Sequence, residues 1–240
     1  MNLLTEYMTL KQKEETLGIT LPKPVYLFTE HYGRSLEEEL PELAKVFGFQ
    51  NYFSFSTDNL SADSNLYQSF YSQMQQAAPT GREFQGCILI SLSDRIQEHD
   101  FTALITLIKS MEGIVPIFTQ KSDADIQTLL PILKNHFFLR IIDGEPYTTE
   151  EQFQIVLDEL IHCGFSLIPE TEQLLTKTLE HCDWKKSDSV SHKLKTIVQN
   201  LAYDKLMNNA DYMLLPEDIT QNFTVTSEKK KSFPIGFSMS

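Results

Sequence analysis

The segment Phe28-Thr29-Glu30-His31-Tyr32-Gly33-Arg34-Ser35 joins a short apolar run, Val25–Phe28, to a helical pattern. The run is β-branched and aromatic and follows Pro22 and Pro24, as expected of a buried strand. The helical pattern has glutamates in its first turns, where carboxylates suit the helix dipole. Its apolar residues are Leu36, Leu40, Leu43 and Val46. This stretch therefore predicts a strand, a loop and a helix that begins at Arg34 or Ser35.

The same alternation continues as far as Ile142. Short apolar runs rich in β-branched or aromatic residues predict strands at Tyr52–Phe55, Gly86–Leu92, Ile114–Thr119 and Phe137–Ile142. Helical spacing of apolar residues predicts helices at Ala62–Ala77, Asp100–Met111 and Asp123–Lys134. Strands that alternate with helices predict an α/β fold, a three-layer structure with a mostly parallel sheet. Pro116 favours an edge or a strand end, because proline donates no hydrogen bond to a sheet.

After Gly144 only helical patterns remain. Thr148 or Thr149 is a helix cap with Glu151 in the following turn, and prolines open two later elements. The predicted elements are a helix from this cap, helices at Pro169–Cys182 and Ser187–Met207, and a short turn at Pro216–Ile219. We therefore predict an α/β core at residues 1–143, with an N-terminal helix at 1–20, an all-helical lobe at 145–222 and a C-terminal tail at 223–240.

Composition limits the function classes. The chain has 240 residues and a formal net charge of −13, which disfavours direct contact with nucleic acid, because phosphate backbones are bound by basic surfaces. Lys229-Lys230-Lys231 is a single basic cluster in the tail, typical of a solvated segment. No apolar stretch approaches the roughly 18 residues that span a bilayer, and no secretion signal is evident, so a cytoplasmic protein without membrane contact is expected.

The ending Gly33-Arg34-Ser35 is close to the Gly-Lys-Ser/Thr that closes a phosphate-binding loop. The earlier glycines of such a loop are missing, Tyr32 is bulky, and Glu30 adds negative charge where a phosphate would lie. Two interpretations follow. Gly33, Arg34 and Ser35 are a relic of a phosphate loop, with Arg34 and Ser35 still able to contact a phosphate, or they are an ordinary turn and helix start.

The order of these segments resembles the AAA+ ATPase family, in particular the branch of stage V sporulation protein K, the Rubisco-activase type and the type VII secretion ATPases. Met111–Thr119 is similar to the strand before sensor 1, and Lys134–Phe137 to the stretch with the arginine finger. Tyr147–Phe153 resembles the start of the family's helical lid, and Leu214–Ile219 its closing turn. The resemblance implies an AAA+-like α/β lobe followed by a helical lid, and an ancestral ATP site at the loop.

The positions that the resemblance marks as catalytic lack the carboxylates and arginines that the family uses there. Ser91 and Leu92 stand where the family has the carboxylates for Mg²⁺ and water, and Asp94 comes two residues late. His136 or Lys134 stands at the finger, and neither is a fixed bidentate cation. The lid contains no arginine, and Lys195 is the nearest basic substitute.

We therefore predict a pseudoenzyme with degenerate Walker motifs: a scaffold or regulatory subunit without catalytic residues, cofactor or metal. Its expected partner is a second copy or an active AAA+ relative. One alternative is an NTPase that binds ATP or ADP with Mg²⁺ through Arg34, Ser35 and Asp94. The other is a clamp-loader-like replication subunit. Three states remain open for the tail, Thr224–Ser240: packing on its own chain, docking on a partner, or disorder.

Overall fold

The computed structural model describes residues 3–59, 65–78, 83–207 and 212–223, and it divides the chain into two compact units. The first unit extends to Pro146 and also contains Lys186–Ser189. The second contains Tyr147–Lys185 and continues from Val190. Of the predicted tail, residues 224–240 lie outside the described residues, whereas Phe223 is described and buried.

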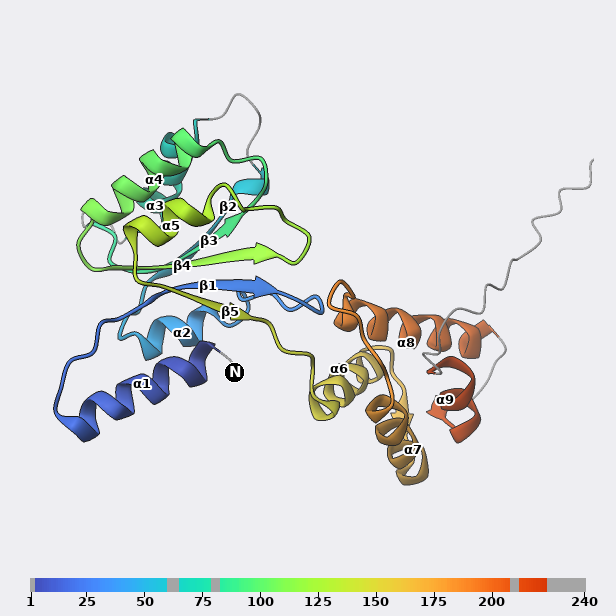
Figure 1. Cartoon of the computed structure of the whole chain (residues 1–240). Helices are drawn as coiled ribbons and strands as arrows, with labels where there is room; N and C mark the ends of the chain where they lie inside the picture. Colours follow the sequence, from blue (N-terminus) through green and yellow to red (C-terminus); the bar gives the residue numbers. More distant parts are fainter. Residues whose placement is uncertain (1–2, 60–64, 79–82, 208–211, 224–240) are drawn as a thin grey trace, which may run out of the picture. The chain divides into compact units, whose positions relative to one another are not determined.

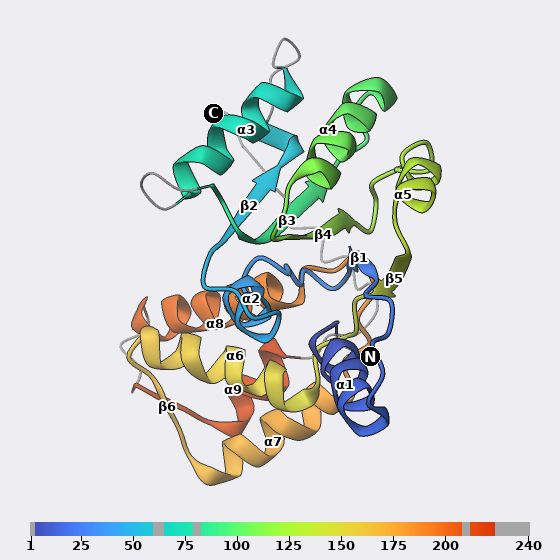
Figure 2. The same cartoon turned by 90° about the vertical axis from the view of Figure 1, so that its left-hand side faces the viewer.

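The first unit is built on a parallel sheet of five strands in the order β2-β3-β4-β1-β5 (Figure 2). Leu27 of β1 pairs with Phe118 of β4 on one side and with Ile141 of β5 on the other. The elements are α1 (Leu3–Leu17), β1 (Val25–Glu30), α2 (Leu40–Val46), β2 (Tyr52–Ser56), α3 (Leu66–Ala77), β3 (Gly86–Leu92), α4 (Glu98–Ser110), β4 (Ile114–Lys121), α5 (Leu130–His136) and β5 (Leu139–Asp143).

Helices cover both faces of this sheet, which confirms the predicted three-layer α/β fold (Figure 1). On one face, α3, α4 and α5 pack against side chains such as Ile88, Ile90 and Phe118. On the other, α1 and α2 pack against Tyr26 and Phe28, among others. Alternate residues of β1, β3 and β4 therefore enter opposite cores, as the two-residue period of a strand requires.

Two helices begin later than predicted, for the same reason. The helix expected from Arg34 or Ser35 begins at Leu40, and the helix expected from Asp123 begins at Leu130. Each has a proline, Pro41 or Pro131, in its first turn. A proline fits the first turn of a helix, but it has no N–H to donate to a preceding turn, so the residues before it form loops.

Other boundaries differ as well. The helix predicted from Ala62 is described from Leu66, since residues 60–64 lie outside the described part of the chain. The prediction that Pro116 marks an edge or a strand end is wrong. It lies inside β4, between β3 and β1, and pairs in register with Ile88.

The second unit consists mainly of helices, with one small addition to the all-helical prediction. Its elements are α6 (Thr149–His162), β6 (Ser166–Leu167), α7 (Pro169–Glu180), α8 (Val190–Met207), β7 (Met213–Leu214) and α9 (Pro216–Asn222). β6 and β7 form a two-stranded parallel sheet. Thr148 caps α6 in a capping box with Glu151. The helix predicted from Ser187 begins at Val190, and Lys186–Ser189 before it belong to the first unit.

Candidate functional site

The carboxyl ends of β1 and β4 mark the place where this sheet favours a ligand. The two strands are neighbours, but the chain leaves β1 toward the face of α2 and leaves β4 toward the face of α5. In an open α/β sheet, such a reversal opens a crevice beyond the carboxyl ends of the strands, and ligands bind there. The segment from Glu30 to Ser35 follows β1 at this edge.

A cavity of about 260 Å³ lies at this edge, and we call it the loop pocket. The candidate residues Gly33, Arg34 and Ser35 line it together. The other lining residues are Glu30, Lys121, Ser122, Asp123, Lys186, Ser187 and Ser189. The structure thus brings the three candidates together, and adds a segment from far along the chain that the sequence did not place there.

The loop has an uncommon backbone conformation. Tyr32 and Gly33 have φ values of 59° and 72°, in the left-handed region that a tyrosine rarely adopts. The Tyr32 N–H donates to the Lys186 carbonyl at 2.8 Å, which holds the loop against the segment Lys186–Ser189. A Cβ placed on Gly33 would lie 2.8 Å from Ser189 Cα. This segment therefore packs directly on the glycine of the candidate loop.

Asp143, at the end of β5, adds a second connection between the loop and this segment. One of its carboxylate oxygens lies 3.7 Å from Lys186 Nζ, and the other lies 3.8 Å from Nε2 of the buried His31. The segment Lys186–Ser189 is thus held by a backbone hydrogen bond, by close packing and by an ion pair.

The backbone N–H groups after the loop are occupied by the chain's own side chains. Leu36 N–H donates to Glu30 Oε1 at 3.4 Å, and Glu37 N–H donates to Ser35 Oγ at 3.3 Å. In phosphate-binding loops, amides at a helix start face the anion. Here the Glu30 carboxylate is an anion that the chain itself supplies.

The basic side chains of the loop pocket also have partners within the chain. Lys121 Nζ lies 2.8 Å from Asp58 Oδ2, and this contact raises the pKa of the lysine. Arg34 Nη2 donates to the Pro146 carbonyl at 3.5 Å. A phosphate would have to compete with the Asp58 carboxylate for Lys121 and with the Pro146 carbonyl for Arg34.

Burial raises the pKa of Glu30 above its ordinary value of 4.5, and the Leu36 N–H opposes this effect. The folded protein then holds the proton more tightly than the unfolded chain, so ionisation of Glu30 lowers stability as the pH rises through the folded pKa. We expect Glu30→Gln to be more stable than the wild type at neutral pH, and the difference to vanish below about pH 4.5. Urea unfolding of both proteins from pH 4 to pH 8 measures this difference in stability. A difference that does not change with pH would contradict the raised pKa of Glu30.

The positions compared with AAA+ catalytic carboxylates contain no acid. Leu92 is buried in the core, and the Ser91 carbonyl accepts a hydrogen bond from Thr57 Oγ1 at 2.8 Å. Asp94 is exposed beyond the strand. Lys134 and His136 lie in the last turn of α5, and Lys195 lies on α8 of the second unit. Within the described residues, no group of three or more His, Cys, Asp and Glu side chains is placed to hold a metal ion.

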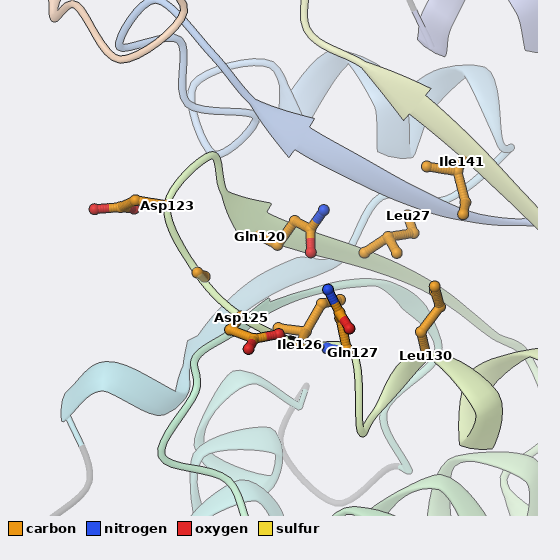
Figure 3. Close-up of a pocket in the computed structure, with 9 residues that line it drawn as sticks. Leu27, Gln120, Asp123, Asp125, Ile126, Gln127, Leu130 and Ile141 are labelled. Carbon is orange, nitrogen blue, oxygen red and sulfur yellow. Dashed lines mark hydrogen bonds between the residues drawn. The ribbon is translucent and has the colours of Figure 1, made fainter.

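A second cavity, of about 320 Å³, lies on the α5 face of the sheet (Figure 3). Leu27, Gln120 and Ile141 line it from the strands, while Gln127 and Leu130 face them from the connection before α5 and from the start of that helix. Gln120 Nε2 donates to Thr29 Oγ1 at 3.0 Å. The sequence did not indicate this pocket because its pattern predicted a helix from Asp123, whereas Asp123–Gln127 form one wall of the cavity.

Comparisons with known proteins identify the fold. No protein-family model and no curated protein sequence matches the chain. Among solved structures, it is similar to the RuvB Holliday junction branch migration motor of Thermotoga maritima, with a TM-score of 0.57 and 10% identity over 92% of this chain and 67% of that one. Two single-residue variants of RuvB match with TM-scores of 0.59 and 0.55 at 11% and 13% identity, over 93% and 92% of this chain and 68% of each variant. RuvB is an AAA+ ATPase, so the chain has the AAA+ fold.

Proposed function

We propose that this chain is an AAA+-like module that does not hydrolyse ATP and acts through protein contacts, as a scaffold or regulatory subunit. Its partner is a second copy or an active AAA+ relative, in the cytoplasm. The proposal rests on two contacts that occupy the loop: Glu30 accepts the Leu36 N–H, and Ser189 packs on Gly33. We also propose that the chain is related to the AAA+ branch of stage V sporulation protein K, the Rubisco-activase type and the type VII secretion ATPases.

The chemistry of phosphoryl transfer supports the same proposal. Transfer requires a metal ion to offset charge on the β- and γ-phosphates, and carboxylates to hold that ion and the attacking water. Ser91 and Leu92 provide neither. Glu30, Glu37 and Asp58 line a cavity of about 170 Å³ beside the loop pocket, where they would repel a triphosphate.

Nucleotide binding without efficient hydrolysis is the second candidate function. The observation in its favour is that Arg34, Lys121 and Lys186 line the loop pocket together. A nucleotide would first have to displace Glu30 and the segment Lys186–Ser189.

Junction DNA, which RuvB acts on, is not the proposed ligand of this chain, because the net charge of −13 opposes binding to a phosphate backbone. Among the described residues, no helix is long and apolar enough to cross a membrane.

We expect ATP turnover by the purified chain to stay below about 10⁻³ s⁻¹, a thousandfold under ordinary enzymes. Arg34→Ala and Asp94→Ala should leave the residual rate unchanged, because neither residue takes part in a reaction. A coupled phosphate-release assay with all three proteins measures this. Turnover that both substitutions abolish would instead establish the remodelled NTPase.

A further inference from the structure

Three carboxylates surround the smaller cavity beside the loop pocket, which we call the acidic cavity. It has a volume of about 170 Å³, and Glu30, Glu37 and Asp58 line it together with Lys121. Lys121 Nζ lies 2.8 Å from Asp58 Oδ2, so this pair is internally balanced. Among the described residues, no lysine or arginine forms an ion pair with Glu30 or Glu37. The acidic cavity therefore has two carboxylates without a cationic partner.

A row of hydroxyl groups forms the buried side of the acidic cavity. Ser56 of β2 pairs in register with Ser91 of β3, which pairs in turn with Thr119 of β4, so the three side chains lie on one face of the sheet. All three line the cavity. Thr119 is only 1% exposed, and its Oγ1 has no hydrogen-bond partner among the described residues. A buried hydroxyl without a partner costs free energy, so this group indicates a ligand that forms a hydrogen bond with it.

The charges around Glu30 favour a positively charged ligand. Burial raises the pKa of Glu30; the Leu36 N–H and Lys121 oppose this effect, whereas Glu37 and Asp58 add to it. The carboxylates thus repel one another in the folded chain. A cation bound between Glu30 and Glu37 would offset both the burial and the repulsion.

The arrangement of the carboxylates favours a cation whose donors are spread in space. Within the part of the chain that the structure describes, no three acidic, histidine or cysteine side chains are placed to hold a metal ion. A guanidinium instead presents five N–H donors in a planar fork, and it is less strongly hydrated than an ammonium. Weak hydration suits a wall that also includes the buried Phe55 and Leu89.

The size and the entrance of the acidic cavity suit the end of one side chain. Its volume lies below the roughly 300–1,000 Å³ of sites that hold a whole small molecule. Ser35 and Glu37 are exposed, whereas Thr119 is buried, so the cavity extends from solvent to the sheet. A side chain from another protein can enter along this direction.

We propose that the acidic cavity binds the guanidinium of an arginine side chain from a partner protein. Glu30 and Glu37 accept hydrogen bonds from its charged N–H groups, and Thr119 Oγ1 accepts a further one. This proposal rests on the proposed function in one respect, since the adjoining loop pocket must hold no nucleotide. It gives that function a partner of stated chemistry, a protein that projects an arginine.

NMR titration of capped tripeptides into the nucleotide-free, full-length chain tests the proposal. A Gly-Arg-Gly peptide should shift the amide signals of Leu36 and Glu37. It should bind at least about tenfold more tightly than the same peptide with citrulline, which has nearly the same shape and no charge. Glu37→Gln should weaken the arginine peptide about tenfold. Glu38→Gln, at an exposed glutamate that does not line the cavity, is the matched control and should leave the affinity unchanged.

Thr119→Val removes the buried hydroxyl and keeps the shape of the side chain. It should weaken the arginine peptide severalfold without lowering the free energy of unfolding, because the hydroxyl has no partner in the free protein. An unchanged affinity would overturn the role of Thr119 and with it the proposed mode of binding.

The remaining outcomes separate other occupants from the proposed one. Equal binding of the arginine and citrulline peptides, or an affinity that Glu37→Gln does not change, would overturn the proposal. Tighter binding of a Gly-Lys-Gly peptide, of Mg²⁺ or of free arginine at the same amides would overturn it in favour of an ammonium, a metal ion or a small molecule. Micromolar binding of ADP would overturn the proposed function and this proposal together, whereas an arginine peptide that does not bind overturns this proposal alone.

Discussion

Replacing Gly33 with alanine is expected to lower the free energy of unfolding by about 3 kcal/mol. Two effects add. The φ of 72° costs an L-residue about 1–2 kcal/mol, and the new Cβ would lie 2.8 Å from the Ser189 Cα, a backbone atom with little freedom to move. The expected result therefore depends on the segment Lys186–Ser189 being packed on the loop.

Gly48 provides a matched control for this substitution. Its φ is 88°, but a Cβ there would meet no atom within 4 Å. Gly48→Ala should lose only the conformational part, about 1 kcal/mol. Urea unfolding of the three proteins measures the difference between the two substitutions. Equal losses would mean that the segment does not cover Gly33.

The fold was largely predictable because local patterns carry it. Four apolar runs after Val25–Phe28 became strands close to their predicted ranges, since continuous apolar sequence is typical of a parallel sheet that is buried on both faces. The late starts of α2 and α5 could also have been predicted from the sequence. Pro41 and Pro131 each mark a first turn, and the apolar periodicity before them belongs to loops that pack on the core.

The structure places the three candidate residues in one pocket, while their role in binding a phosphate stays a prediction. Gly33, Arg34 and Ser35 lie in the loop after a buried strand and resemble the end of a phosphate-binding motif. They line one pocket. Nothing local indicates that Lys186–Ser189 cover them, because more than 150 residues separate the segment from Gly33. The contact between Glu30 and the Leu36 N–H depends in the same way on how the loop turns after β1.

Nucleotide affinity is the second quantity for which we expect a large effect. A dissociation constant weaker than about 1 mM is expected for ADP and for ATP with Mg²⁺, against micromolar values in a working site, a difference of about 4 kcal/mol. The reason is that the amide donors, the cations and the space at Gly33 already have partners in the chain. Arg34→Ala should not change the result.

Isothermal titration of ADP, and of ATP with Mg²⁺, into the wild type, Arg34→Ala and Arg95→Ala measures whether the loop pocket binds a nucleotide. Arg95 is an exposed arginine that does not line the loop pocket, so it controls for a general loss of positive charge. We expect no saturable heat from any of the three proteins. Micromolar binding by the wild type and Arg95→Ala that Arg34→Ala abolishes would contradict it.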